Sequence, residues 1–199
     1  NLLINKAIEM TDRQRSIILG SLLGDASLRK TNINPIFTCE HGIKQLEYCK
    51  WKAKELESLG AKFSTSKRKT IDKRTGLYYE SAICRLPANP VLLPIYNNLY
   101  KNGKKTITSE YLESFNELSL AVMFMDDGYR LGKTVGIATN CFTVEECSIF
   151  NDMLVAKFGI VFNITKNGTL YLPTKQYPAF EELVLPYMHN TMMYKLIVS

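Results

Sequence analysis

Two aspartates in matching sequence contexts are the residues of this chain best placed for chemistry. Asp25 closes the apolar run at residues 17–26, and Asp127 closes the similar run at residues 120–128. They lie about half the length of the 199-residue chain apart, a spacing that predicts an internal duplication. A single aspartate before a small residue most often only starts a turn, but a matched pair favours a functional role.

The first run is predicted to be a buried helix. It begins at a capping box in which Thr11 is the N-cap and Gln14 reaches back, and it is apolar on nearly all sides. It is too short and too charged at its start to span a bilayer. Gly20 and Gly24 stand four residues apart on one face, which lets another helix approach closely.

The second run is predicted to be a helix of matching design that packs on the first about a pseudo-twofold axis. It follows a second capping box at residues 114–117, with Asn116 as the alternative cap. Val122 and Asp126 fall where the first run has its two glycines. The second helix is therefore bulkier at the crossing and carries an extra carboxylate.

Both aspartates are expected at helix C-termini, where a negative charge is unfavourable. The helix end carries partial negative charge, which disfavours a carboxylate by up to about 1 kcal/mol, and two neighbouring carboxylates also repel each other. A divalent cation with oxygen ligands would compensate. Mg²⁺ suits aspartate oxygens, and Mn²⁺ or Ca²⁺ should also be able to occupy such a site.

The two runs resemble the signature motifs of LAGLIDADG homing endonucleases, in particular the single-chain, monomeric type that carries two motifs. Residues 104–107 (KKTI) and 192–195 (MMYK) resemble further family segments that carry active-site lysines. The resemblance therefore extends over nearly the whole chain. The departures from the motif pattern are Ser21, Val122 and Asp126.

This resemblance implies a metal-dependent endonuclease that cuts a long double-stranded DNA site and leaves short 3′ overhangs. One carboxylate from each half suits one cut in each strand. The implied catalytic residues are Asp25, Asp127, Lys105 and Lys195. The implied metal ligands are Asp25, Asp127 and the backbone carbonyl oxygens of Gly24 and Asp126.

Composition agrees with a nucleic-acid partner and with an intracellular protein. The net charge is +6 and the pI is near 9, which favours a polyanion. The five cysteines show no zinc spacing and are expected to be buried, small apolar residues in a reducing compartment. We expect no membrane association and no secretion. A mitochondrion, a chloroplast or a prokaryotic cytoplasm would all fit.

Periodicity and turn signals predict an α+β fold in which the order αββαββα occurs twice. Residues 1–103 would form the first half and residues 104–199 the second, joined by a polar connector at 101–108. Two curved antiparallel sheets would form a saddle, with the motif helices at its centre. The helix at 43–59 is expected to point Lys44, Lys50, Lys52 and Lys54 mostly outward.

The expected strands and remaining helices follow from local patterns. In the first half the strands are 27–30, 36–40, 62–71 and 77–86, and a helix follows at 91–100. In the second half a helix at 144–158 begins at the capping box formed by Thr143 and Glu146. The remaining second-half elements are strands near 129–133 and 135–141, a hairpin at 160–166 and 169–172 that turns at Asn167–Gly168, and a last helix at 178–188.

Basic residues crowd the expected strands and hairpin tips, where they could contact phosphates and base edges. A basic hairpin tip can also be merely solvated, but beside the paired motifs the DNA interpretation is favoured. The expected DNA-binding residues are Arg29, Lys30, Lys67, Arg68, Lys69, Lys73, Arg74, Arg85, Arg130, Lys133 and Lys166.

The main alternative is a protein of the same fold that binds without cutting. Some relatives are maturases that act on their own intron RNA, and others bind DNA as regulators. A chain that had lost cleavage would be free to lose an acidic motif residue. Asp25 and Asp127 are both present, which favours cleavage, and a dual nuclease and maturase stays open.

Overall fold

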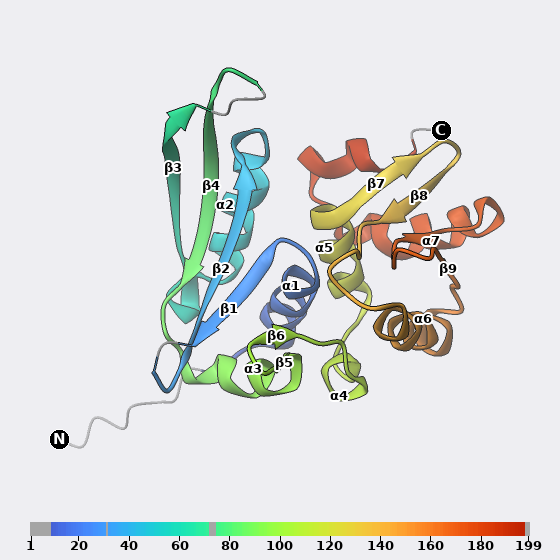
Figure 1. Ribbon diagram of the computed structural model, residues 1–199, viewed down its shortest axis with the longest axis horizontal. Coiled ribbons are helices and arrows are strands. Elements are labelled where there is room, and N and C mark those ends of the chain that lie inside the picture. Colours follow the sequence, from blue (N-terminus) through green and yellow to red (C-terminus); the bar gives the residue numbers. More distant parts are fainter. Residues whose placement is uncertain (1–8, 31, 72–74, 198–199) are drawn as a thin grey trace.

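The computed structural model describes residues 9–30, 32–71 and 75–197. It places two α/β halves side by side, with α1 (Asp12–Leu23) and α5 (Glu117–Asp127) between them (Figure 1). Helix α1 opens the first copy of the repeated αββαββα order, and α5 opens the second. Each of these helices leads directly into the first strand of its own sheet, so the helix ends and the sheets are positioned together.

The two antiparallel sheets have the same strand order. The first has the order β1-β2-β4-β3 and the second β7-β8-β10-β9, and neither closes on itself. The first comprises β1 (Ala26–Lys30), β2 (Pro35–Gly42), β3 (Lys62–Ile71) and β4 (Tyr78–Leu86). The second comprises the shorter β7 (Gly128–Leu131), β8 (Thr134–Ile137), β9 (Asn163–Ile164) and β10 (Leu170–Tyr171). The predicted α+β class and duplicated order are confirmed.

The remaining elements connect and cover the sheets. In the first half these are η1 (Ile43–Gln45), α2 (Leu46–Glu55), η2 (Glu57–Leu59), η3 (Pro90–Leu92) and α3 (Leu93–Leu99). A short hairpin of β5 (Tyr100–Lys101) and β6 (Lys104–Lys105) crosses the predicted boundary between residues 103 and 104, which stays a prediction. Next come α4 (Ser109–Leu112), α6 (Val144–Phe158), η4 (Thr174–Gln176), α7 (Tyr177–Val184), η5 (Leu185–Tyr187) and η6 (Asn190–Lys195).

Local capping chemistry explains where the long helices begin. Thr11 with Gln14 and Thr143 with Glu146 form the two reciprocal capping boxes that the sequence predicts. The box predicted at residues 114–117 is wrong. Asn116, the alternative, is the N-cap of α5 because its side chain accepts from the Ser119 amide.

Several other expectations need correction. The predicted helix at 43–59 is split into α2 between two short 3₁₀ turns, and the left-handed Gly60 ends it. The turn near Asn167 is a three-residue loop because the Thr165 amide donates to the Thr169 carbonyl and Gly168 has φ +77°. Cys141 is exposed, whereas the other four cysteines are buried, and all five are free.

No helix among the described residues is long and apolar enough to cross a membrane.

The crossing of α1 and α5 depends on the two glycines of α1. A Cβ atom at Gly20 would meet the carbonyl oxygen of Ser119 and lie 2.9 Å from the Cβ of Val122. A Cβ at Gly24 would lie 2.5 Å from the Cβ of Asp126. The bulky residues of α5 thus occupy the space that the glycines leave, as the offset between the two motifs predicts.

Substituting Gly20 by alanine should destabilise the protein. Alanine favours a helix by about 1 kcal/mol over glycine, but the added methyl would force apart two backbones, at a cost of about 1–3 kcal/mol or more. Urea denaturation should therefore give a lower midpoint. Gly42→Ala is the control, since a Cβ there has no atom within 4 Å, and an equal loss in both variants would contradict this account.

Candidate active site

Asp25 and Asp127 lie together where the two motif helices end. Asp127 is the last residue of α5, and Asp25 follows Gly24, the residue that ends α1. The backbone N–H of Asp25 donates to Oδ2 of Asp126 at 3.3 Å, which fixes the two ends against each other. As predicted, the two aspartates lie at the same end of the helix pair.

The carboxylate of Asp127 is in an unfavourable environment for a charge. Burial, together with the nearby charges of Asp25 and Asp126, raises the pKa of Asp127 to about 7, although Lys195 and Lys105 oppose this shift. Among the described residues, no side chain forms a hydrogen bond or ion pair with this carboxylate. It is the group in the site with most to gain from a cation.

Asp25 is better supported. Its side chain is 34% exposed, and its Oδ2 lies 3.1 Å from Nδ1 of the buried His41 in β2. Burial acts to raise the pKa of Asp25, but the contact with His41 and the charges of Lys52 and Lys195 outweigh it, so this pKa lies below its ordinary value. The two carboxylates are therefore electrostatically unequal.

The two expected lysines reach backbone carbonyl groups next to the aspartates. Lys105 Nζ donates to the Ala26 carbonyl at 2.6 Å, and Lys195 Nζ donates to the Asp126 carbonyl at 2.7 Å. Burial lowers the pKa of both lysines from the ordinary value. Both ammonium groups thus lie at the site, one beside each motif helix end, although the Asp126 carbonyl already accepts a hydrogen bond from Lys195.

A fully buried ion pair lies beneath the aspartates. Lys52 Nζ in α2 donates to both carboxylate oxygens of Asp126, at 2.7 and 2.8 Å, and neither side chain is exposed. The Tyr48 hydroxyl also donates to Asp126, at 2.9 Å. Burial alone would lower the pKa of Lys52, but Asp126 raises it, so Lys52 stays an ammonium. The expectation that Lys52 points outward is wrong.

Cys39, His41 and Asp126 cluster closely enough to suggest a metal site, but Lys52 argues against one. Its Nζ lies 3.4 Å from Cys39 Sγ and 3.2 Å from His41 Nε2, in addition to its bonds to Asp126. The ammonium therefore already supplies the positive charge that this cluster would seek. His41 and Lys52 were not among the site residues expected from the sequence, although strand alternation places His41 on the helix-facing side of β2.

The open face of the first sheet carries basic residues in register. Helix α2 packs on the side of Phe37, Cys39 and Cys84, so alternation leaves the neighbouring residues on the other side. Ser27, Thr38, Arg85 and Lys62 form one cross-strand row of this open face. The same alternation places Arg29 and Arg68 there. Lys62 was not among the expected DNA contacts.

Not all expected DNA contacts share that face. Lys67 lies on the helix side of β3, where it pairs with Glu80 at 3.0 Å. Arg130 is exposed but occupies the position corresponding to the buried Leu28 of the first sheet. Lys30 is exposed, with its ammonium 5.7 Å from the Tyr96 ring centre. Lys73, Arg74 and the side chain of Lys69 lie outside the described residues.

The second sheet presents a different face. Its cross-strand row consists of Tyr129, Gly136, Tyr171 and Asn163. Tyr129, Tyr171 and Leu131 are exposed. Lys133 and Lys166 are exposed too, but both lie in loops beyond the strands. The first half thus offers mainly cations, and the second mainly aromatic and apolar surface.

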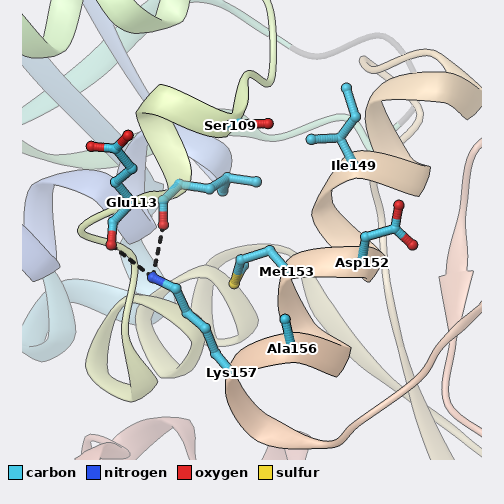
Figure 2. Close-up of a pocket in the computed structure, with 8 residues that line it drawn as sticks. Ser109, Glu113, Ile149, Asp152, Met153, Ala156 and Lys157 are labelled. Atoms are coloured by element: carbon cyan, nitrogen blue, oxygen red, sulfur yellow. Dashed lines mark hydrogen bonds between the residues drawn. The ribbon is translucent and has the colours of Figure 1, made fainter.

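A hollow between α4 and α6 does not contribute to this site. Figure 2 shows Lys157 directed at the end of α4, where its Nζ donates to the carbonyls of Leu112, Glu113 and Phe115 at 2.7–2.9 Å. Lys157 is thereby committed to capping that helix. Glu113 and Asp152 also line this hollow, but neither of the motif aspartates, Asp25 and Asp127, does.

The comparisons with known proteins agree with this geometry. The model of the LAGLIDADG DNA endonuclease family matches residues 15–180, which include most of α1, all of α5 and both sheets. The chain belongs to the LAGLIDADG DNA endonuclease family. The homing endonuclease I-WcaI, solved bound to its DNA recognition sequence, has the same fold, with a TM-score of 0.85 over 98% of this chain and 89% of the other at 24% identity.

Curated relatives of this LAGLIDADG chain include proteins with different names. Protein RecA of Mycolicibacterium flavescens is 29% identical over 94% of this chain and 47% of its own length. The cytochrome b mRNA maturase bI2 of Debaryomyces hansenii is 33% identical over 51% of this chain and 41% of its own length. The chain thus spans about half the length of these relatives or less.

Removing the buried ammonium should destabilise the fold. Lys52→Met would leave the Asp126 carboxylate buried without its cation, which typically costs about 3–5 kcal/mol. The double variant Lys52→Met with Asp126→Asn should recover part of this loss because the uncompensated charge is gone. Lys54→Met is the control, since its pair with Glu57 is exposed to solvent and should contribute little to stability. Equal unfolding midpoints for Lys52→Met and Lys54→Met would refute the role of the pair.

Removing the charge of Asp127 should stabilise the protein when no divalent metal is present. The pKa of Asp127 in the folded protein is about 7, above the ordinary value of 3.8. The protein therefore loses stability as the pH rises from about 4 to 7. Asp127→Asn should therefore unfold at a higher temperature than the parent at pH 8 in EDTA. A difference on the order of 1–2 kcal/mol is expected, and it should shrink at pH 5, where the parent carboxyl is protonated. A difference that grew toward pH 5 would contradict this.

Proposed function

We propose that this protein is a homing endonuclease that cuts both strands of a long DNA site in a divalent-metal-dependent reaction. The observation that carries this proposal is the pair of carboxylates, Asp25 and Asp127, delivered to one place by two crossing helices of the same design. Membership of a DNA endonuclease family supports the reaction class. One carboxylate from each half suits one cut in each strand of a duplex.

The donor set fits Mg²⁺. Asp25 and Asp127 offer oxygen ligands. The pKa of Asp127 is raised because the carboxyl is buried and lies near the charges of Asp25 and Asp126, which Lys195 and Lys105 only partly offset. The backbone carbonyls of Gly24 and Asp126 are further candidate ligands, although the latter would be shared with Lys195. A bound divalent ion would activate water and stabilise charge on the phosphate.

Lys105 and Lys195 are proposed as the cationic groups that stabilise charge developing on the phosphate oxygens. Each is already at the site, tied to a carbonyl beside an aspartate, so little rearrangement is needed. Their hydrogen bonds hold them as ammonium donors pointing at the end of the helix pair. A purely structural role would instead confine them to these carbonyls when DNA is bound.

The two open sheet faces are proposed as the DNA surface. Strands can enter the major groove, where Arg29, Arg68, Arg85 and Lys62 could read base edges or contact phosphates. The second face, with Tyr129, Leu131 and Tyr171, could contact thymine methyl groups instead. Because both motifs are in one chain, a monomer can present both halves of the surface.

Maturase activity is the alternative, and the resemblance to the cytochrome b mRNA maturase bI2 favours keeping it. Binding of intron RNA would use the same basic surface but would not require two carboxylates at the helix ends. The presence of both, in an arrangement that costs stability, favours cleavage.

The deciding experiment is cleavage of a randomised duplex DNA library in Mg²⁺, followed by sequencing of the ends. The parent protein should give double-strand cuts at a defined site. Asp25→Asn and Asp127→Asn should each reduce double-strand cutting by at least about 10²-fold, and EDTA should abolish it.

Asp152→Asn is the matched control because it removes an aspartate from α6 outside the site, and it should cut normally. Binding of the library without cutting in Mg²⁺ or Mn²⁺ would reject the endonuclease proposal and favour the maturase. Equal activity of Asp127→Asn and Asp152→Asn would show that the paired carboxylates are not the catalytic groups.

A further inference from the structure

His41 is a buried polar group that the proposed reaction does not yet use. Its side chain is fully buried on the helix-facing side of β2. One nitrogen, Nδ1, lies 3.1 Å from Oδ2 of Asp25, and it has no well-aligned hydrogen bond among the described residues. A buried nitrogen with that one near acceptor invites a functional explanation.

The other side of the imidazole is held by two donors. Lys52 Nζ and Cys39 Sγ both lie 3.2 Å from Nε2. An ammonium can only donate, and burial raises the pKa of the Cys39 thiol well above its ordinary value, so the thiol is a donor too. Nε2 must therefore accept, which puts the imidazole proton on Nδ1, facing Asp25.

Lys52 is itself fixed in place. Both carboxylate oxygens of Asp126 accept from it, and Tyr48 donates to the same carboxylate. The chain of contacts therefore runs from the second motif helix, through Asp126, Lys52 and His41, to Asp25 of the first motif. The backbone of Asp25 is tied to the same carboxylate through its N–H.

Within the described part of the second half, no histidine contacts Asp127 in the way that His41 contacts Asp25. Ala26 pairs with Cys39 and Gly128 pairs with Ile137, so Thr139 is the counterpart of His41. The Thr139 hydroxyl donates to the Gly168 carbonyl instead, within its own half. Among the described residues, the Asp127 carboxylate receives no corresponding contact.

We propose that His41 is a positioning residue for Asp25: the Nδ1–H of His41 orients one carboxylate oxygen of Asp25 and leaves the other oxygen for a metal ion. Cleavage of one DNA strand would then depend on His41, and cleavage of the other strand would not. The proposal rests on the proposed endonuclease function. Groups behind a metal ligand that orient it typically affect metal affinity or activity by 10–100-fold. Here the effect should fall on one strand.

The test compares two substitutions that preserve different nitrogens of the imidazole. In His41→Asn the amide lies near the place of Nδ1 and can still donate to Asp25. In His41→Gln the amide lies near the place of Nε2 and keeps the polar contact with Lys52 only. Both are polar and of similar size, so unequal results cannot be attributed to simple loss of the buried side chain.

The first DNA probe is a supercoiled plasmid that carries the duplex site cut by the parent protein, and it reports nicking. The second is a linear fragment with the same site, end-labelled on one strand or the other, and it reports the cleavage rate of each strand. His41→Gln should slow cleavage of one strand by about 10–100-fold and accumulate nicked plasmid. His41→Asn should stay close to the parent. Thr139→Ala, the counterpart in the second half, should leave the ratio of the two strand rates unchanged.

Equal slowing of both strands by His41→Gln, or equal behaviour of His41→Gln and His41→Asn, would overturn the positioning role. A strand imbalance in Thr139→Ala would do the same. Failure of the endonuclease proposal itself is distinguishable because the parent protein would then cut neither strand of the plasmid.

Discussion

The close crossing of α1 and α5 is the constraint on which the rest of the structure depends. Gly20 and Gly24 remove the side chains that would keep the helices apart, and Val122 and Asp126 occupy the vacated space. The helix ends are thereby locked together, and each helix leads straight into a sheet. A single contact thus sets both the meeting of the carboxylates and the relative placement of the two open sheet faces.

The second determinant is the buried pair of Lys52 and Asp126. Taking two charges out of water is costly, and well-packed apolar residues would often be as stable. This pair nevertheless links α2 of the first half to α5 of the second, and both carboxylate oxygens and a tyrosine hydroxyl take part. Its geometry fixes the tautomer of His41, so the pair contributes specificity of arrangement at the site and not merely cohesion.

Local rules predicted those parts of the structure that are set by neighbours in the sequence. The capping boxes at Thr11 and Thr143, the repeated element order and the glycine offset between the motifs could all be read from spacing. The burial of Lys52 could not be predicted, because a lysine on a helix is normally exposed to solvent. Its position beside Tyr48 and Cys49 on the apolar stripe was a signal, but its partner, Asp126, is 74 residues away in the chain.

Two motifs joined in one chain allow the two halves to differ within one repeated fold. A symmetric dimer must present identical surfaces and identical sites. A single chain with two motifs has no such requirement, so mutations can accumulate in one half alone. Asp126 corresponds to Gly24 of the first motif, and His41 corresponds to Thr139 of the second half. The first sheet has a basic open face, whereas that of the second is aromatic. Backbone order is retained because the helix crossing needs it, while the charges around each carboxylate have diverged. If the proposed endonuclease activity holds, such a chain is suited to a duplex site whose two half-sites have different sequences.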